Sequence, residues 1–516
     1  MVSPATSAVP AAVPSSILPA STSTFLGMLH SIRFVTSSHR RSLCLTGAAL
    51  GFVLSVSGAA AQTATPLSRL TDRVFAPWDS STRPGCAVGI AQGNQPRFTR
   101  AYGLAELEFG APNAGNTIFE AGSVSKQFTA AAVVLLALDG KLRLDDDVRK
   151  YMPELRAYER PITIRHLLNH TSGLRDWGDI AALAGWPRST RVHTHDHVLE
   201  IIARQSALNY PPGDKYSYTN SGFNLLPMIV ARVSGQSFAQ FSRDRIFTPL
   251  GLTYTSWRDD FTRVVKGRAQ AYAPARGAWM LDMPFENVHG NGGLLTTVDD
   301  LLTWTAMLEK PDAKWKPLVD SMHVKGRLTN GDSISYALGL FVDQYRGIKR
   351  VQHSGATAGY RAYVTRYPGR DLAIAVLCNA ASANPTAYAN VITDSLLRSV
   401  LAVVPARAAA AAPTPAPAGN AAAGIAPWTP TAAQLREFVG EYYSADVEAT
   451  YSIRADSTGG LLLVQRPASR ARMRALSVDT FDAGGQPLTF KRDASGRVTE
   501  LHVATARAYD VVFGRR

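Results

Sequence analysis

A serine and a lysine stand three residues apart just ahead of a long apolar stretch. Ser123 and Lys126 precede a run rich in Ala, Val and Leu that ends at Gly140, which predicts a helix with a glycine stop. At this spacing both side chains lie on one side of the first turn. A lysine amine can take the serine proton once burial lowers its pKa, and helix N-terminal N–H groups favour developing negative charge. The pair predicts a nucleophilic serine; the alternative is a capping serine beside a solvated lysine.

A second candidate group follows the helix-breaking Pro-Pro-Gly sequence at 211–213. Tyr218 and Asn220 are two residues apart, so their side chains point the same way where the chain is extended. A phenol beside an ammonium group can hold a lowered pKa and shuttle protons, and an asparagine amide can bind a substrate carbonyl. The alternative is a packed tyrosine followed by an asparagine in a turn.

A third candidate group is His353-Ser354-Gly355, after which the residues alternate as in an edge strand. Gly355 has no side chain, which would let a substrate backbone lie close to that strand. The N–H of Ala356 is a candidate oxyanion donor. The alternative is an ordinary glycine-rich strand entry. Each of the three patterns is weak by itself, but their order, with a helix after the first and a strand after the third, is a strong signal.

The elements that position these groups are predicted at both ends of a long domain. Segments 84–93 and 96–103 resemble one strand hairpin, and 361–379 resembles another, with helical patterns between them. This arrangement predicts a sheet closed by N- and C-terminal pieces, with a helical insert. Cys86 and Cys378 lie in the end strands, where they either meet and oxidise or stay buried as small apolar residues.

The chain divides at an Ala- and Pro-rich segment, 405–430, which is expected to be a linker. It separates a domain at 66–404 from a shorter one at 431–516. The shorter domain has only brief alternating runs between Gly- and Asp-rich turns, which predicts a small antiparallel barrel or sandwich. Its role is either to stabilise the protein and bind partners, or to gate access to the main site.

Residues 1–61 are expected to be a signal peptide with a long Ser- and Ala-rich lead-in. A basic run at 39–41, an apolar run at 43–56 and three alanines at 59–61 follow the order of a secretory signal. The alternative is an uncleaved membrane anchor, but the apolar run is shorter than the ~20 residues that a spanning helix needs. We therefore expect a bacterial protein exported to the periplasm or secreted, with no stable membrane span after cleavage.

Composition excludes several other classes. With 46% hydrophobic and 18% charged residues, the 516-residue chain is neither disordered nor a polytopic membrane protein. The net charge is +14, but no Lys/Arg block is interleaved with aromatic residues, so no nucleic-acid partner is expected. The 3 cysteines include no C-x-x-C pair, which excludes a zinc ribbon.

Two histidine groups are considered as metal ligands and rejected. The sequence His-Thr-His-Asp-His at 193–197 lacks one spacer residue of a zinc-hydrolase motif, and is better explained as a helix start capped by Thr194. His166 and His170 are expected four apart on one helix, without an acidic partner nearby, and in a structural role. No metal or organic cofactor is expected.

The order S-x-x-K, Y-x-N, H-x-G resembles the penicillin-recognising serine hydrolases. That group includes class C β-lactamases, DD-peptidases, D-aminopeptidases and β-lactamase-like esterases. The resemblance covers about 80–400, and further segments that carry it are 140–155, 162–174, 289–304 and 336–340. It implies an α+β, β-lactamase/transpeptidase-like fold, in which a mixed sheet flanked by helices adjoins an all-helical region and the site lies between them. The small C-terminal domain resembles the lipocalin-like barrels of D-peptide-cleaving members.

The resemblance also implies a role for each candidate residue. Ser123 would be the acylated nucleophile, Lys126 its proton acceptor and Tyr218 the general acid/base. Asn220 would position the substrate, and the N–H groups of Ser123 and Ala356 would form the oxyanion hole.

One residue departs from the pattern of the most efficient members. His353 and Gly355 occupy the third motif, where β-lactamases and DD-peptidases mostly carry Lys, whose charge helps to bind a carboxylate. A histidine is largely neutral near pH 7. This difference favours the esterase and aminopeptidase branches.

We therefore expect a serine hydrolase that cleaves small esters or amides through a covalent acyl-enzyme, as an esterase or a D-aminopeptidase-like enzyme. A β-lactamase or DD-carboxypeptidase is the first alternative, and a catalytically silent protein that binds peptidoglycan fragments is the second. The expected partner is a small ester, amide or peptide, and peptidoglycan fragments are a further candidate.

Overall fold

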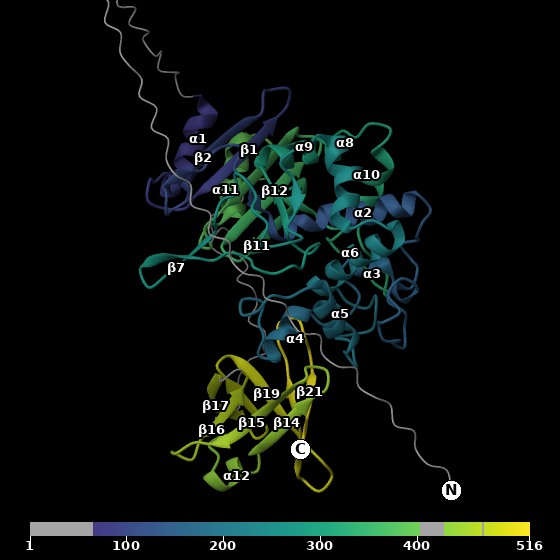
Figure 1. The fold of residues 1–516 in the computed structure, drawn as a ribbon, viewed down its shortest axis with the longest axis vertical. Helices are drawn as coiled ribbons and strands as arrows, with labels where there is room; N and C mark the ends of the chain where they lie inside the picture. Colours follow the sequence, from purple (N-terminus) through teal and green to yellow (C-terminus); the bar gives the residue numbers. More distant parts are fainter. Residues whose placement is uncertain (1–64, 403–427, 467–468) are drawn as a thin grey trace, which may run out of the picture. The chain divides into compact units, whose positions relative to one another are not determined.

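The computed structural model describes residues 65–402, 428–466 and 469–516 (Figure 1). The predicted signal peptide and nearly all of the predicted linker lie outside these residues. Residues Thr63–Arg516 belong to one compact unit, which contains both the long domain and the short one.

A six-stranded antiparallel sheet forms the centre of the long domain, in the order β10-β11-β12-β13-β1-β2. The two predicted hairpins are present as β1–β2 and β12–β13, and β1 joins them by pairing with β13. The expected closure of the sheet by both ends of the domain is therefore confirmed. The strands are β1 (Cys86–Gln92), β2 (Phe98–Tyr102), β10 (Phe341–Tyr345), β11 (Ile348–Thr357), β12 (Tyr360–Tyr367) and β13 (Leu372–Cys378).

Helices cover both faces of this sheet (Figure 1). Helix α9 (Val298–Glu309) packs on β1 and β13, while α11 (Pro385–Leu396) packs on β12 and β13 and carries α1 (Pro66–Phe75) beside it. Because neither face meets water, the central strands are continuous apolar runs rather than alternating ones.

The helical region is built around α2 (Lys126–Leu138), which packs against α6 (Asn220–Ser234) and α10 (Lys316–Met322). Its sequence is apolar on every side, and most of its residues are buried, as expected for a helix inside a core. Gly140, with φ of 71°, ends it as predicted. The other helices are α3 (Ile164–Leu168), α4 (Trp177–Leu183), α5 (His195–Ala203), α7 (Phe238–Ser242) and α8 (Thr248–Leu250).

Short strand pairs connect these layers. The small sheet β5-β9-β6 is the important one for the site, because β5 leads directly into the segment that carries Ser123. The short strands are β3 (Leu104–Glu106), β4 (Ala111–Pro112), β5 (Phe119–Glu120), β6 (Ser256–Trp257), β7 (Tyr272–Ala275), β8 (Ala278–Leu281) and β9 (Leu294–Thr296).

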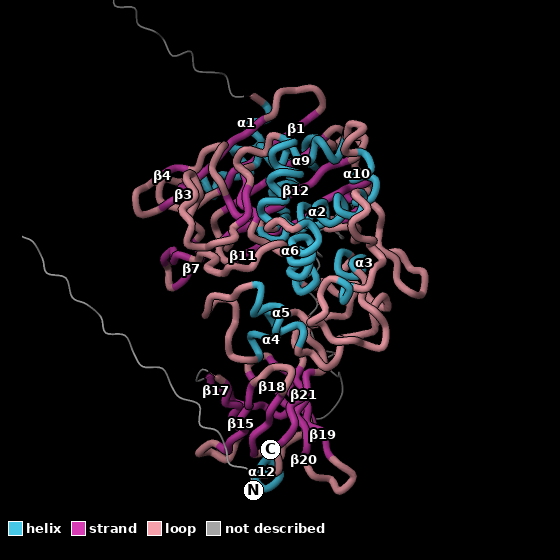
Figure 2. Tube along the Cα trace, turned by 45° about the vertical axis from the view of Figure 1, so that its right-hand side comes forward, coloured by secondary structure: helices cyan, strands magenta, loops and turns pink. Residues whose placement is uncertain are grey.

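The C-terminal domain is a closed antiparallel barrel, which confirms the predicted small barrel (Figure 2). A single short helix, α12 (Ala432–Arg436), precedes it among the described residues. The strands are β14 (Gly440–Ser444), β15 (Ala449–Ala455), β16 (Leu461–Gln465), β17 (Ser469–Ser477), β18 (Thr480–Ala483), β19 (Gln486–Arg492), β20 (Val498–Val503) and β21 (Val511–Arg515).

A disulfide joins Cys86 to Cys378, across a sequence separation of 292 residues. The two residues are opposite each other in the pairing of β1 with β13, and both are fully buried. Of the two possibilities that the sequence left open, the structure has the oxidised pair.

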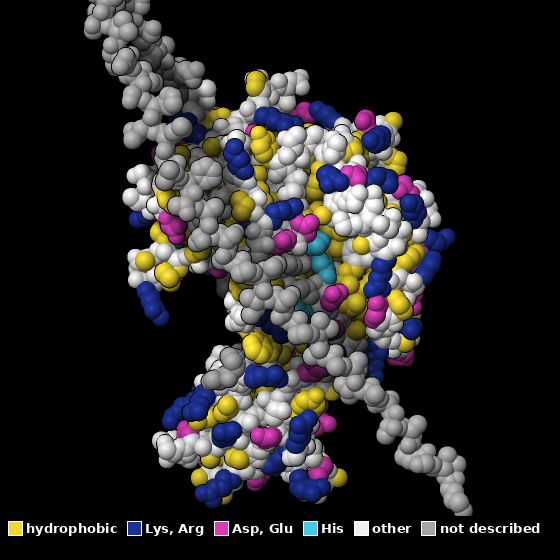
Figure 3. All heavy atoms as spheres, viewed as in Figure 1, with side chains coloured by type: hydrophobic (Ala, Val, Ile, Leu, Met, Phe, Trp, Pro, Cys, Tyr) yellow, Lys and Arg dark blue, Asp and Glu magenta, His cyan; other side chains and the backbone are white. Residues whose placement is uncertain are grey.

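The charged side chains are dispersed over the face drawn in Figure 3, with Lys and Arg intermixed with Asp, Glu and apolar groups. Among the described residues, no helix is both long and apolar enough to span a membrane.

Candidate active site

Ser123 lies on a short 3-10 turn, Gly122–Ser125, which runs directly into α2. Gly122 has φ of 50°, and a Cβ built on it would stand only 2.6 Å from the backbone nitrogen of Ala356. A side chain at that position would therefore push the nucleophile segment away from β11. The glycine is what lets the turn of Ser123 lie against the third motif.

Lys126 is completely buried beneath the serine. Its Nζ lies 3.1 Å from the Oγ of Ser123, 3.0 Å from Oδ1 of Asn220 and 2.8 Å from the carbonyl oxygen of Asn291. Burial is the main reason that the pKa of Lys126 falls well below its usual 10.5, and Asp176 only partly opposes this shift. A neutral amine in this position can accept the proton of the serine hydroxyl.

Tyr218 lies over the same amine, with Nζ of Lys126 4.8 Å from its ring centroid. The predicted lowering of its pKa is wrong: burial raises the pKa of Tyr218 well above 10. The cause is that a buried phenolate would lose its hydration, and the side chains of Ser123 and Arg507 oppose the rise only in part. The buried hydroxyl makes no hydrogen bond of regular geometry with a described residue, but the side chain of Ser123 is close enough to oppose the rise of its pKa, so the phenol lies beside the nucleophile.

The third motif lies on β11 where that strand has lost its outer neighbour. Strand β10 pairs with β11 only as far as Gln352, so His353 to Thr357 pair on the β12 side alone. The predicted edge is therefore present at this point, although β11 is not the outermost strand of the sheet.

The structure gives a further reason for the glycine in this motif. A Cβ on Gly355 would stand 2.0 Å from the carbonyl oxygen of Ala121 and 3.1 Å from the nitrogen of Ser123. The close approach of the chain's own nucleophile segment thus already requires glycine at this position. It brings the backbones of Ser123 and Ala356 together at one side of the cavity.

His353 is a buried, neutral group, as expected from the sequence. Burial lowers its pKa to about 3, with a smaller contribution from Lys126. Its Nδ1 lies 2.6 Å from the carbonyl oxygen of Ser354 and its Nε2 3.1 Å from the hydroxyl of Tyr336. In the neutral ring Nδ1–H therefore donates and Nε2 accepts, so His353 adds no positive charge.

These groups line a single cavity of about 660 Å³. Six of the seven predicted site residues are on its wall, and Lys126 lies directly beneath it. Those on the wall are Ser123, Tyr218, Asn220, His353, Gly355 and Ala356. Segments more than two hundred residues apart in the sequence thus meet at one place.

His170 borders this site in the structural role expected for it, but it does not lie on one helix with His166. Helix α3 ends at Leu168, and His170 lies beyond it with φ of 58°. Its ring centroid is 4.2 Å from that of Tyr218, and its Nδ1 accepts a hydrogen bond of 3.3 Å from the nitrogen of Thr219. It holds the second motif in place.

Asp176 is a second site group that no motif in the sequence indicated. Its Oδ2 accepts a 2.7 Å hydrogen bond from the nitrogen of Asn220 and a 3.3 Å bond from the hydroxyl of Thr219. Its Oδ1 caps α4 through the nitrogen of Gly178. One buried carboxylate thereby fixes the start of α6 against α4.

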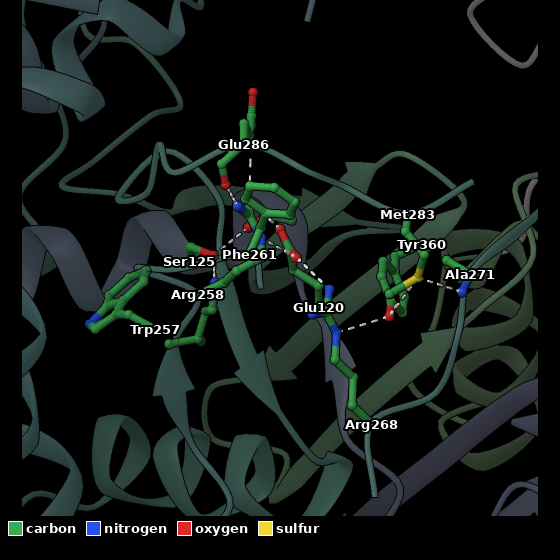
Figure 4. A network of polar contacts seen from close by, with 12 residues as sticks. Glu120, Ser125, Trp257, Arg258, Phe261, Arg268, Ala271, Met283, Glu286 and Tyr360 are labelled. Atoms are coloured by element: carbon green, nitrogen blue, oxygen red, sulfur yellow. Dashed lines mark hydrogen bonds and ion pairs between the residues drawn. The ribbon is translucent and has the colours of Figure 1, made fainter. Parts of the chain in front are cut away.

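A buried ionic cluster supports the strand that leads into the nucleophile segment (Figure 4). Glu120 of β5 binds Arg258 at 2.8 Å and Arg268 at 3.3 Å. Arg258 also reaches the backbone of Glu286, whose carboxylate pairs with Arg188. Because Arg188 lines the cavity, the cluster connects the base of the nucleophile turn to the cavity wall.

The rejected histidine motif has the structure that was predicted for it. Thr194 caps α5, and His197 completes a capping box with it. His195 pairs with His289, at 3.3 Å between Nε2 and Nδ1. In the part of the chain that is described, no group of three or more potential ligands is placed to hold a metal ion.

A serine whose hydroxyl contacts a buried amine of lowered pKa, beside a phenol and a strand edge left unpaired on one side, defines a serine hydrolase of the acyl-enzyme class. The chain belongs to the beta-lactamase family, whose model matches residues 70–398.

Two relatives illustrate the range of the family. A penicillin-binding protein of Bacillus subtilis (strain 168) is 30% identical over 297 residues, which are 54% of this chain and 64% of that protein. A D-aminopeptidase of Cereibacter sphaeroides is 28% identical over 299 residues, 57% of each chain. The chain thus spans about three fifths of the length of the curated relatives that it matches.

Solved structures share the fold. An octameric penicillin-binding protein homologue from Pyrococcus abyssi has a TM-score of 0.59 at 21% identity, covering 87% of this chain and 99% of that one. A D-amino acid amidase from Ochrobactrum anthropi has a TM-score of 0.55 at 21% identity, covering 65% of this chain and 99% of that one.

Proposed function

We propose that the protein hydrolyses small esters or amides through an acyl-enzyme on Ser123. The observation that carries this proposal is the 3.1 Å contact between the hydroxyl of Ser123 and the buried amine of Lys126, which forms no ion pair with a described carboxylate. In the first step Oγ attacks the substrate carbonyl and its proton passes to Nζ. The C–N or C–O bond then breaks, Tyr218 donates its proton to the leaving group, and the proton held by Nζ passes to the oxygen of Tyr218 in its place.

The remaining groups bind the reacting carbonyl. The N–H groups of Ser123 and Ala356 stabilise the oxyanion, an interaction that typically lowers the activation barrier by ~3–4 kcal/mol for each donor. Oδ1 of Asn220 accepts a hydrogen bond from Nζ of Lys126, which leaves Nδ2 to donate to the substrate. Water then attacks the acyl-enzyme and releases the acid.

The relatives named D-aminopeptidase and D-amino acid amidase support amide substrates. The alternative, a β-lactamase or DD-carboxypeptidase, is weakened at the third motif, where the neutral His353 cannot itself bind a carboxylate. The second alternative, a silent protein that binds peptidoglycan fragments, is weakened by the intact contact between nucleophile and base.

A substrate panel tests the proposal. Short-chain p-nitrophenyl esters, D- and L-amino-acid amides and nitrocefin are offered to one preparation at equal concentration. We expect the best ester or amide to exceed nitrocefin in kcat/KM by about 10² or more. Faster turnover of nitrocefin would support the β-lactamase alternative, and a protein that turns over none of them would support the silent one.

We also propose that the protein acts in the periplasm or after secretion. The signal-like order of residues 1–61 supports this location, as does the Cys86–Cys378 disulfide, a bond that persists in oxidising compartments. N-terminal sequencing of protein from the exported fraction should begin at Gln62. A mature chain that retains residues 1–61 in the cytosolic fraction would contradict the proposal.

A further inference from the structure

A loop of the C-terminal barrel reaches the catalytic cavity. The residues between β20 and β21, 504–510, bring Arg507 to the wall that also carries Ser123 and Tyr218. None of the three motifs in the sequence includes this arginine, which follows the whole hydrolase domain in chain order.

The loop is held by specific hydrogen bonds. The carbonyl oxygen of Arg507 accepts from the nitrogen of Asp176 at 3.0 Å and from Nδ2 of Asn209 at 2.9 Å. Its own nitrogen donates to Oδ2 of Asp179 at 3.0 Å. The backbone of the loop is therefore fixed to the segment that positions Asn220.

Contacts outside the loop fix the barrel to the same region. Arg175 and Asp446 form a buried ion pair of 2.7 Å, and the hydroxyl of Tyr451 donates to the carbonyl oxygen of Leu183 at 3.0 Å. Ile180 and Leu183 pack within the core of the barrel. The position of the loop thus follows from an extensive buried contact.

The guanidinium of Arg507 keeps N–H donors that are not occupied by a hydrogen bond within the described residues. It lies 5.7 Å from the centroid of Tyr218 and 3.7 Å from Oδ2 of Asp176. That oxygen already accepts the shorter hydrogen bond from Asn220. The side chain of Arg507 is 40% exposed, so a guanidinium face remains open to a solute in the cavity.

The charged residues that line the cavity are all basic. They are Arg188, Arg361 and Arg507, with no Asp or Glu among the described lining residues. Arg188 is balanced by Glu286. Arg361 donates to the carbonyl oxygens of Ala358 and Tyr360 and has no ion pair among the described residues.

Asp176, 3.7 Å from the guanidinium of Arg507, offsets part of this charge, but it does not line the cavity. Lys126 and His353 are both driven toward their neutral forms by burial, which lowers the pKa of each. Asp282, an acid whose charge acts on Arg361, lines a neighbouring cavity rather than this one. A carboxylate entering the site therefore meets arginine, whereas an ammonium group finds no acid on the described wall.

We propose that Arg507, supplied by the barrel, is a specificity-determining residue that makes the site prefer substrates bearing a carboxylate over substrates bearing a free ammonium group. The inference rests on the proposed function and narrows its substrate class. An aminopeptidase must accommodate a free ammonium group, so this selectivity separates the chain from its relatives of that name.

Three p-nitroanilides of one amino acid, with a free, an N-acetylated and an N-succinylated amino group, test the preference in the full chain. We expect kcat/KM for the succinyl substrate to exceed kcat/KM for the free amine by tenfold or more. Arg507→Gln should lower this succinyl-to-amine ratio about tenfold, and Arg507→Glu should lower it further. Arg507→Lys should largely keep it. Arg497→Gln makes the same charge change at an 81% exposed side chain of the barrel and should leave the ratio unchanged.

A ratio that stays the same in both Arg507→Gln and Arg507→Glu, or a wild-type preference for the free amine, would overturn the inference.

Calorimetry on Ser123→Ala protein, with N-succinyl-D-phenylalanine amide and D-phenylalanine amide as probes, separates the inference from the proposed function. If the Ser123→Ala protein binds the succinyl probe more tightly than the free amine, but the wild type is not acylated, only the proposed function is refuted. If the wild type is acylated, but the Ser123→Ala protein binds both probes equally, only the inference about Arg507 is refuted. If Arg507→Gln does not fold, the Lys and Glu variants carry the comparison.

Discussion

Ser123→Ala is expected to abolish turnover and covalent labelling while leaving the protein folded. Its Oγ is the hydroxyl in contact with the amine of Lys126, so no neighbouring group can take over its role. Loss of such a nucleophile costs on the order of 10⁶-fold in kcat. Intact-mass spectrometry after incubation with a fluorophosphonate should show one adduct on the wild type and none on the variant.

Ser354 provides the matched control, because it is the other serine on the described cavity wall. Ser354→Ala should still be labelled, and the labelled peptide of the wild type should contain Ser123. Ser125 is no rival, since its buried hydroxyl is bonded to the carbonyl oxygen of Gly122 and the nitrogen of Leu294. An adduct that persists in Ser123→Ala would refute the assignment.

The second large effect is a pH dependence that belongs to Lys126. Below the pKa of Lys126 the amine is protonated and cannot accept the serine proton, so kcat/KM should rise with pH and level off. Burial places the pKa of Lys126 well below 10.5, so the rise should be complete well before that pH. The two neighbouring histidines cannot produce it in the neutral range, since burial lowers the pKa of His353 to about 3 and that of His170 well below 6.5.

Lys126→Arg isolates this effect. A guanidinium stays protonated at every accessible pH, so we expect a loss of about 10³-fold or more that alkaline pH does not restore. Lys126→Met should lose activity to a similar extent and show no acid limb. Lys150, an exposed lysine, is the control, and Lys150→Met should reproduce the wild-type profile. An acid limb with an unchanged midpoint in Lys126→Met would assign the base to another group.

Local sequence patterns were sufficient to predict much of this structure. The hairpins, the glycine stop of α2 and the Thr194 cap depend on residues close together in the chain, and each is present. The three motifs were found for the same reason, since each keeps its chemistry within four residues. The barrel was predicted from the regular spacing of its turns.

What the sequence could not provide depends on burial and on distant contacts. The pKa of Tyr218 was misjudged because the degree of burial is a property of the folded cavity. Gly355 faces Ala121, and Arg507 reaches Tyr218, only after segments far apart in the chain have packed. No periodicity or spacing near these residues indicates such a contact.

The place of β1 in the sheet has a consequence for biosynthesis. This strand leaves the ribosome early, but one of its two neighbours is β13, whose Cys378 comes 292 residues after Cys86. Until β13 has been translated, β1 has only β2 beside it in the sheet. A two-stranded hairpin is marginally stable at best in water. The nascent chain therefore stays incompletely folded until nearly the whole hydrolase domain has been translated.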